Sequence, residues 1–129
     1  MSEARLTGGF LPGVHPLDGY GSGGFRFAGM GHRGSILLLP DGIHAWDAVA
    51  LADITAESLE PALRLKRGVL ELLLVGTGVD LVPVPAALRQ RLKQAGIVAE
   101  PMSTGAAART YNVLLGEGRR VGAALLALP

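Results

Sequence analysis

The chain has 129 residues, of which 49% are hydrophobic, so it can bury one core and is short for two domains. It has no cysteine, which excludes disulfides, thiolate metal sites and a cysteine nucleophile. Twelve basic and eleven acidic side chains leave a net charge of +1, which argues against a nucleic-acid binder that works through a broad charged face. Nineteen glycines and eight prolines predict many tight turns.

The N-terminal residues carry both charge signs, and no apolar run of signal-peptide length follows them before Pro12. No apolar run in the chain is long enough for a membrane helix. We therefore expect a cytoplasmic protein without a transmembrane segment. Prolines and glycines interrupt every period in residues 1–24, which we predict to form an extended N-terminal lead-in. Residues 25–129 are predicted to form a single α/β domain.

The first half of this domain is predicted to consist of antiparallel hairpins. Residues 25–28 alternate between large apolar and other side chains, which indicates a half-buried strand. After a glycine-rich turn, residues 35–39 form a continuous apolar run that ends at Pro40. Residues 43–46 resume in the style of a strand, so a hairpin is expected.

The second half alternates strands and helices. Residues 53–63 hold a short helix or turn at most, and residues 69–75 are apolar at six of seven positions, which is typical of a central strand covered on both faces. Residues 97–102 predict a second buried strand, and residues 121–128 predict a last one. With helices between them, these strands predict a mixed, mostly parallel sheet.

Two main helices are expected between these strands. The first begins at Pro85, shows Leu88 and Leu92 at helical spacing, and ends at Gly96. The second is capped by Ser103 or Thr104 and ends at a pair of glycines. Its predicted inner face consists of Ala107, Tyr111, Leu114 and Leu115.

Gly29, Gly31 and Gly34 match the pattern of a phosphate-binding loop, in which three glycines lie between a strand and a helix. The residues that follow them are strand-like, so no helix N-terminus is available to receive a pyrophosphate. We predict a hairpin turn here.

The densest set of polar side chains lies near the carboxyl end of the predicted central strand and along the last helix, where open α/β sheets bind ligands. The candidate ligand-binding residues are Gly76, Thr77, Gly78, Thr104, Arg109, Tyr111, Asn112 and Glu117. One interpretation is a crevice for a small anion, with Arg109 fixing the charge and Glu117 or Tyr111 transferring a proton. The other interpretation is structural, in which these residues cap the helix and form turns. Both remain open at this stage.

No catalytic set can be named from the sequence. The three histidines at positions 15, 32 and 44 lie far apart without metal-ligand spacing, so we expect no metal site. Of the three histidines, His44 is a weak acid–base candidate. We therefore expect no cofactor, and the sequence favours a non-enzymatic role.

Several segments, in this order and spacing, carry a resemblance to a known family. They are residues 24–27, 43–46, 75–78, 104–114, 117–119 and 121–125. With them the chain resembles the Mth938-like family, the group that includes a mitochondrial complex I assembly factor. Ser103 stands where many relatives carry Asp.

The resemblance implies a three-layer α/β domain with a mixed sheet, two main helices and a β-hairpin extension. It also implies a protein-interaction factor whose partners are respiratory-complex subunits or assembly factors, with peripheral membrane association through those partners. An edge strand of the hairpin half could pair across a homodimer. The alternative function is a small-molecule binding protein or enzyme that uses the crevice between residues 76–78 and 104–112.

Overall fold

The computed structural model describes residues 6–129, which form nine strands, three α-helices and two short 3-10 helices. The strands are β1 (Phe10–Pro12), β2 (Gly19–Gly21), β3 (Gly24–Phe27), β4 (Met30–Arg33), β5 (Ser35–Leu39), β6 (Gly42–Trp46), β7 (Leu72–Gly76), β8 (Val98–Met102) and β9 (Val121–Leu125). The helices are α1 (Glu60–Leu63), α2 (Ala86–Gln94) and α3 (Thr104–Gly116), and the 3-10 helices are η1 (Thr7–Gly9) and η2 (Leu51–Asp53). Among residues 6–129 there is no helix with the length and apolar character needed to cross a membrane.

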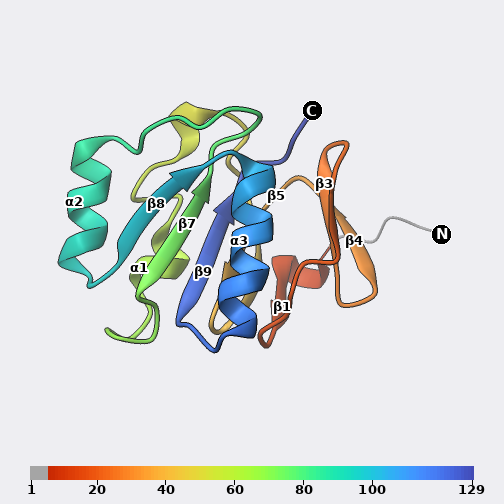
Figure 1. The fold of residues 1–129 in the computed structure, drawn as a ribbon, viewed down its shortest axis with the longest axis horizontal. Coiled ribbons are helices and arrows are strands. Elements are labelled where there is room, and N and C mark those ends of the chain that lie inside the picture. The colour runs from red at the N-terminus through yellow and green to blue at the C-terminus, as the bar shows by residue number, and fades with distance from the viewer. Residues whose placement is uncertain (1–5) are drawn as a thin grey trace.

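Six strands form one mixed sheet in the order β1-β6-β5-β9-β7-β8. β7 runs parallel to both β8 and β9, whereas β5 pairs antiparallel with β6 and β9, and β6 with β1. Strands β2, β3 and β4 form a separate antiparallel sheet beside α3 (Figure 1). The predicted α/β class with two main helices is confirmed, and the hairpin segments divide between the two sheets.

The central strands of the main sheet are buried on both faces, which produces three layers. On one face, Leu73 and Val75 of β7 join a core with Leu88 and Leu92 of α2. On the other, Leu74 joins a core with the inner side of α3 and the phenylalanines of β3. The nearly continuous apolar sequence of β7 follows from its central position.

β8 differs from its prediction as a buried strand. β8 is an edge strand of the main sheet, so it pairs with one strand only, β7. Val98 is 60% exposed and Glu100 is also exposed, while Ala99 between them is buried. This alternation shows that β8 is covered on one face only.

Both main helices end in the same kind of glycine stop. After α2, Ile97 N donates to Leu92 O at 3.0 Å and Gly96 N donates to Lys93 O at 2.9 Å, with Gly96 at a φ of +81°. These bonds form a Schellman motif, which confirms the predicted end of the helix. α3 ends likewise at Gly118. At the other end of α2, Pro85 is the N-cap, one position before its predicted place.

The N-terminal part contains strands that the sequence analysis did not predict. β1 joins the edge of the main sheet beside β6, and β2 pairs with β3. The glycine segment 29–34 is also more regular than predicted, because Gly31 lies inside β4. β5 follows this segment directly, so the prediction that it lacks the helix of a dinucleotide-binding loop is confirmed.

Two tight turns set the register of the small sheet. The β2–β3 turn has Ser22 at a φ of 45° and Gly23 at 82°, and the β3–β4 turn has Ala28 at 51° and Gly29 at 73°. Positive φ at both central residues is the backbone of a type I′ turn, which matches the twist of a hairpin. Ser22 and Ala28 adopt this conformation at an energetic cost, because their Cβ atoms crowd the backbone.

We predict that Ala28→Asn stabilises the protein. Asn tolerates the left-handed conformation better than Ala, and Asn-Gly is the preferred pair for this turn, so the free energy of unfolding should rise by about 0.5–1 kcal/mol. Urea denaturation of both proteins measures the change. The control is Ala87→Asn on the exposed side of α2, which should lower stability by about 0.5 kcal/mol through helix propensity. A loss of stability in Ala28→Asn would contradict the strain at this turn.

Candidate functional site

The carboxyl end of β7 meets the beginning of α3, as the order of strands and helices predicted. Thr104, the first residue of α3, is completely buried. Its hydroxyl donates a hydrogen bond to Leu126 O at 2.8 Å and accepts one from Gly78 N at 3.0 Å. Its backbone N donates to Gly78 O at 2.8 Å. Thr104 therefore joins three segments of the chain through its own backbone and hydroxyl.

The glycines of this loop are needed for close approach and for backbone shape. A Cβ at Gly76 would lie 2.8 Å from Leu125 Cδ2 and 3.0 Å from Thr104 Cα, so only glycine lets the strand end pack against the helix start. Gly78 has a φ of +101°, which disfavours any side chain. Both glycines thus have a sufficient structural explanation.

Thr77 is also occupied by the protein. Its Oγ1 lies 2.6 Å from Asp80 O and 3.1 Å from Met102 O, and it accepts a hydrogen bond from Val82 N at 3.0 Å. The side chain is buried, and it holds the loop that follows β7 in a closed turn. An anion at this position would have to displace existing bonds.

The polar residues in the middle of α3 bind the N-terminal segment. Asn112 Oδ1 accepts from Leu17 N at 2.8 Å, and its Nδ2 donates to Leu17 O at 2.7 Å. Arg109 Nη1 donates to the hydroxyl of Tyr20 at 2.6 Å. The side chain of Asn112 thus pairs with the backbone of Leu17 as a neighbouring strand would, because a carboxamide offers the same donor and acceptor as a peptide group.

Tyr111 makes the third contact to this segment. Its hydroxyl donates to His15 O at 2.9 Å, and burial raises the pKa of Tyr111 to about 12. The phenol is therefore neutral at physiological pH, because desolvation penalises the charged form. This makes Tyr111 a poor base for the proton transfer that the anion-site hypothesis assigns to it.

Glu117 lies apart from the other candidates. It caps the C-terminal end of α3 and is exposed, whereas Thr104 begins the same helix. Thirteen residues at a rise of roughly 1.5 Å per residue separate the two ends by about 20 Å. The structure therefore brings Gly76, Thr77, Gly78 and Thr104 together and leaves Glu117 outside. A ligand-binding role for these residues stays a prediction, and their hydrogen bonds support the structural interpretation.

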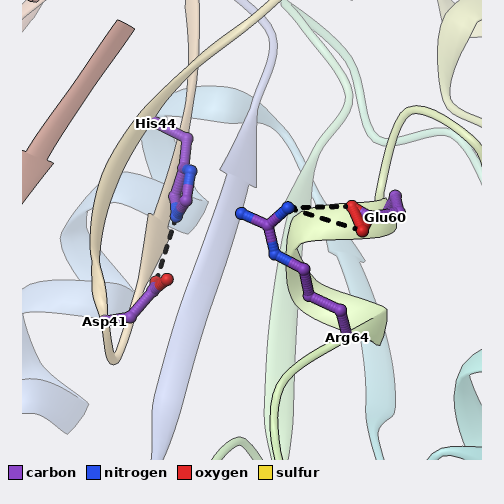
Figure 2. A network of polar contacts seen from close by, with 4 residues as sticks. All are labelled: Asp41, His44, Glu60 and Arg64. Atoms are coloured by element: carbon purple, nitrogen blue, oxygen red, sulfur yellow. Dashed lines mark hydrogen bonds and ion pairs between the residues drawn. The ribbon is translucent and has the colours of Figure 1, made fainter. Parts of the chain in front are cut away.

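His44 has a local partner in the hairpin between β5 and β6. Figure 2 shows its contact with Asp41. His44 Nε2 lies 3.0 Å from Asp41 Oδ1, and the His44 ring lies 4.7 Å from that of Phe10 in β1. Figure 2 also shows an ion pair between Glu60, the first residue of α1, and Arg64, which caps the C-terminal end of α1. Both side chains are about half exposed, so the pair contributes about a few tenths of a kcal/mol. Across residues 6–129, His, Asp and Glu side chains form no group of three suited to a metal ion.

The residues that the sequence analysis missed are the partners of α3. Leu17, His15 and Tyr20 lie in the segment predicted as a lead-in, roughly ninety residues before the side chains that bind them. No local pattern marks a residue whose backbone is bound by a distant carboxamide. The one available signal was the cluster of hydrogen-bonding side chains on a single stretch of helix, Arg109 to Asn112.

We predict that the hydroxyl of Thr104, rather than its shape, is needed for stability. Thr104→Val should lower the free energy of unfolding by about 2–3 kcal/mol, because it leaves Leu126 O and Gly78 N buried without a partner. Thr104→Ser keeps the hydroxyl and should cost about 1 kcal/mol for one lost methyl group. Guanidinium denaturation separates the two variants. An equal loss in both would show that the hydrogen bonds contribute little.

Comparison with known proteins places this geometry in a family. Residues 17–126 match the family described as proteins of unknown function (DUF498/DUF598). An uncharacterised protein of Rhodobacter capsulatus is 48% identical over 117 residues, which cover 91% of this chain and 88% of that protein. The NADH dehydrogenase (ubiquinone) 1 alpha subcomplex assembly factor 3 of Mus musculus is 35% identical over 113 residues, or 88% of this chain. The chain spans 60% of the length of that assembly factor.

Solved structures support the same family assignment. A structure described as an outer membrane protein from Bartonella henselae is 47% identical with a TM-score of 0.84, covering 92% of this chain and 98% of that one. A Mth938-like domain from Bordetella pertussis is 30% identical with a TM-score of 0.75, covering 98% of this chain and 90% of that one. Because the family match spans most of the sequence and the fold matches too, the chain belongs to the Mth938-like (DUF498/DUF598) family, which also contains the assembly factor 3 proteins.

Proposed function

We propose that the chain is a non-enzymatic protein-interaction factor that assists the assembly of respiratory NADH dehydrogenase. The observation that carries this proposal is the likeness to assembly factor 3, which extends over nearly the whole chain. The internal use of Thr77, Thr104 and Asn112 supports it, because the side chains best placed for catalysis are bound to the protein itself. Partners would be subunits or assembly factors of that complex.

Exposed apolar side chains support an interaction role. Val49, just before η2, is 83% exposed, and Leu51, within η2, is 44% exposed. In the loop after β7, Val79 is 68% exposed and Leu81 is 59% exposed. These two loops meet, because residues from both line one small cavity of about 100 Å³. Large apolar side chains that gather on a surface are typical of contacts with other proteins.

The proposal also assigns the place of action. The partners of an assembly factor for a membrane-bound complex lie at the membrane, so the chain would act from the cytoplasm and reach the membrane surface through those partners. Cell fractionation tests this assignment. Recovery in the periplasm or outer membrane would contradict it.

The test of the function is a strain that lacks the gene. We expect the strain to lose assembled NADH dehydrogenase on native gels, and the wild-type chain to restore it. We also expect subunits or assembly factors of the enzyme to copurify with the tagged chain. Normal enzyme levels in the deletion strain, together with copurification of none of these partners, would contradict the proposal.

A matched pair of variants makes this test specific. Leu81→Asp places a charge on the apolar loops and should lower the recovery of partners, because burying an unpaired charge in an interface is costly. Val113→Asp on α3 is the control, since Val113 is 60% and Leu81 59% exposed. Equal effects of the two substitutions would argue that the apolar loops have no special part in the interaction.

A further inference from the structure

The two apolar loops, residues 47–54 and 77–85, lie at the same edge of the main sheet. β6 runs antiparallel to β5, β5 runs antiparallel to β9, and β9 runs parallel to β7, so β6 and β7 end at the same edge. The chain leaves β6 into the first loop and β7 into the second. Because residues of both loops line one cavity, the loops form a single surface.

This cavity reaches the hydrophobic core. Three of the residues that line it, Ile54, Val75 and Val84, are buried members of the core that contains α2. Leu51 also lines the cavity and is partly open to solvent. A side chain that occupied the cavity would therefore contact core residues directly, as the anchor residues of protein interfaces do.

The size of the cavity favours a side chain over a small molecule. Pockets for small molecules have volumes of roughly 300–1,000 Å³, several times the volume of about 100 Å³ here. An apolar cavity of roughly 150 Å³ holds one benzene molecule, so this smaller one suits an aliphatic side chain. Its lining is apolar apart from Thr77, whose hydroxyl is hydrogen-bonded within the loop.

Hydrogen bonds hold both loops in place before any partner binds. In the first loop, Asp53 Oδ2 accepts from Val49 N at 2.9 Å and from Ala50 N at 3.0 Å. In the second loop, Thr77 Oγ1 accepts from Val82 N at 3.0 Å. The hydrogen bonds from Ala50 and Val49 also lower the pKa of Asp53, because they favour its charged form. A surface that is already ordered loses little entropy on binding.

Carboxylates accompany the exposed apolar side chains. Asp47 and Asp53 flank those of the first loop, and Asp80 lies between those of the second. All three aspartates are exposed, and none of them forms an ion pair within the described part of the chain. Residues 34–63 and 68–88 contain no lysine or arginine. The apolar loops therefore carry negative charge without a basic side chain of their own.

We propose that the apolar loops bind a partner protein through a segment in which an aliphatic side chain is flanked by lysine or arginine. The aliphatic side chain fills the cavity, and the basic side chains pair with Asp47, Asp53 and Asp80. This inference rests on the proposed interaction role and specifies the chemistry of the partner. The three aspartates repel an anionic lipid surface, so the charges favour a protein over a membrane.

The test is a nuclear magnetic resonance titration of the full chain with a capped peptide that has a central leucine between two pairs of lysines. The peptide should shift the methyl signals of Leu51, Ile54 and Val82 in a saturable way. Alanine in place of its leucine should weaken binding by roughly tenfold or more, because buried apolar groups are lost. Glutamate in place of its lysines should abolish binding. Shifts that do not saturate, or equal affinity for any two of these peptides, would overturn the proposal.

Variants of the chain assign the binding to the apolar loops. Asp47→Asn and Asp80→Asn should each weaken binding of the leucine–lysine peptide by roughly twofold to fivefold, and this loss should shrink at high salt. Glu117→Gln removes the same charge at the far end of α3 and should leave the affinity unchanged. Leu51→Ala should weaken binding, and Val113→Ala on exposed α3 should not. Unchanged affinity in the variants at positions 47, 51 and 80 would overturn the proposal.

Two results separate this inference from the assembly role. If the peptide binds as expected and the deletion strain still has normal NADH dehydrogenase, the assembly role fails and the surface stands. If the double variant Asp47→Asn and Asp80→Asn restores the enzyme and recovers partners as well as the wild type does, the surface fails and the assembly role stands. Binding to phosphatidylglycerol vesicles, or dimerisation of the chain, that Leu51→Ala abolishes would overturn the choice of a partner protein as the occupant.

Discussion

The carboxamide of Asn112 holds both backbone groups of Leu17, and this pair of hydrogen bonds connects the two parts of the molecule. On one side is the rigid stack of the main sheet and α3. On the other is the segment that leads from β1 into the small sheet. Leu17 is itself buried in the core that contains the phenylalanines of β3, so the two bonds and the apolar contacts act on the same residue. Tyr111 and Arg109 add contacts at His15 and Tyr20.

This arrangement gives the polar side chains of α3 a structural role. Arg109, Tyr111 and Asn112 contact a segment far from them in sequence, and Thr104 contacts the loop after β7 and the end of β9. α3 thus makes hydrogen bonds to the N-terminal segment, to the loop after β7 and to the end of β9. The consequence reaches the small sheet, because the hydroxyl of Tyr20 in β2 accepts the hydrogen bond from Arg109.

The sequence was informative where burial is continuous or where one residue type is required. Residues 35–39 are a strand as predicted, because the apolar run is unbroken and Pro40 stops it. Gly96 ends α2 as predicted, because only the left-handed conformation completes that stop. The meeting of Gly76 with Thr104 also follows from the order of strands and helices, because β7 runs parallel to β8 and α3 begins directly after β8.

The small sheet and the partners of α3 could not be predicted in the same way. β2 has three residues and two of them are glycine, so no alternation of side chains marks it as a strand. The two turns of the small sheet place Ser22 and Ala28 at positive φ, where Asn, Asp and Gly are preferred. The partner of Asn112 is a backbone group 95 positions away, which leaves no trace in the sequence of either segment. The glycines of residues 19–24, predicted as a loose lead-in, include three that lie in β2 and β3.

The central claim is that α3 holds the N-terminal segment and the small sheet against the main sheet. Native-state hydrogen exchange in Asn112→Ala tests it most directly, with Val113→Ala on the exposed side of α3 as the control. The account predicts faster exchange in β2, β3 and β4 of Asn112→Ala, while the amides of β7 stay as slow as in the wild type. Unchanged exchange in the small sheet, or an equal increase in β7, would contradict it.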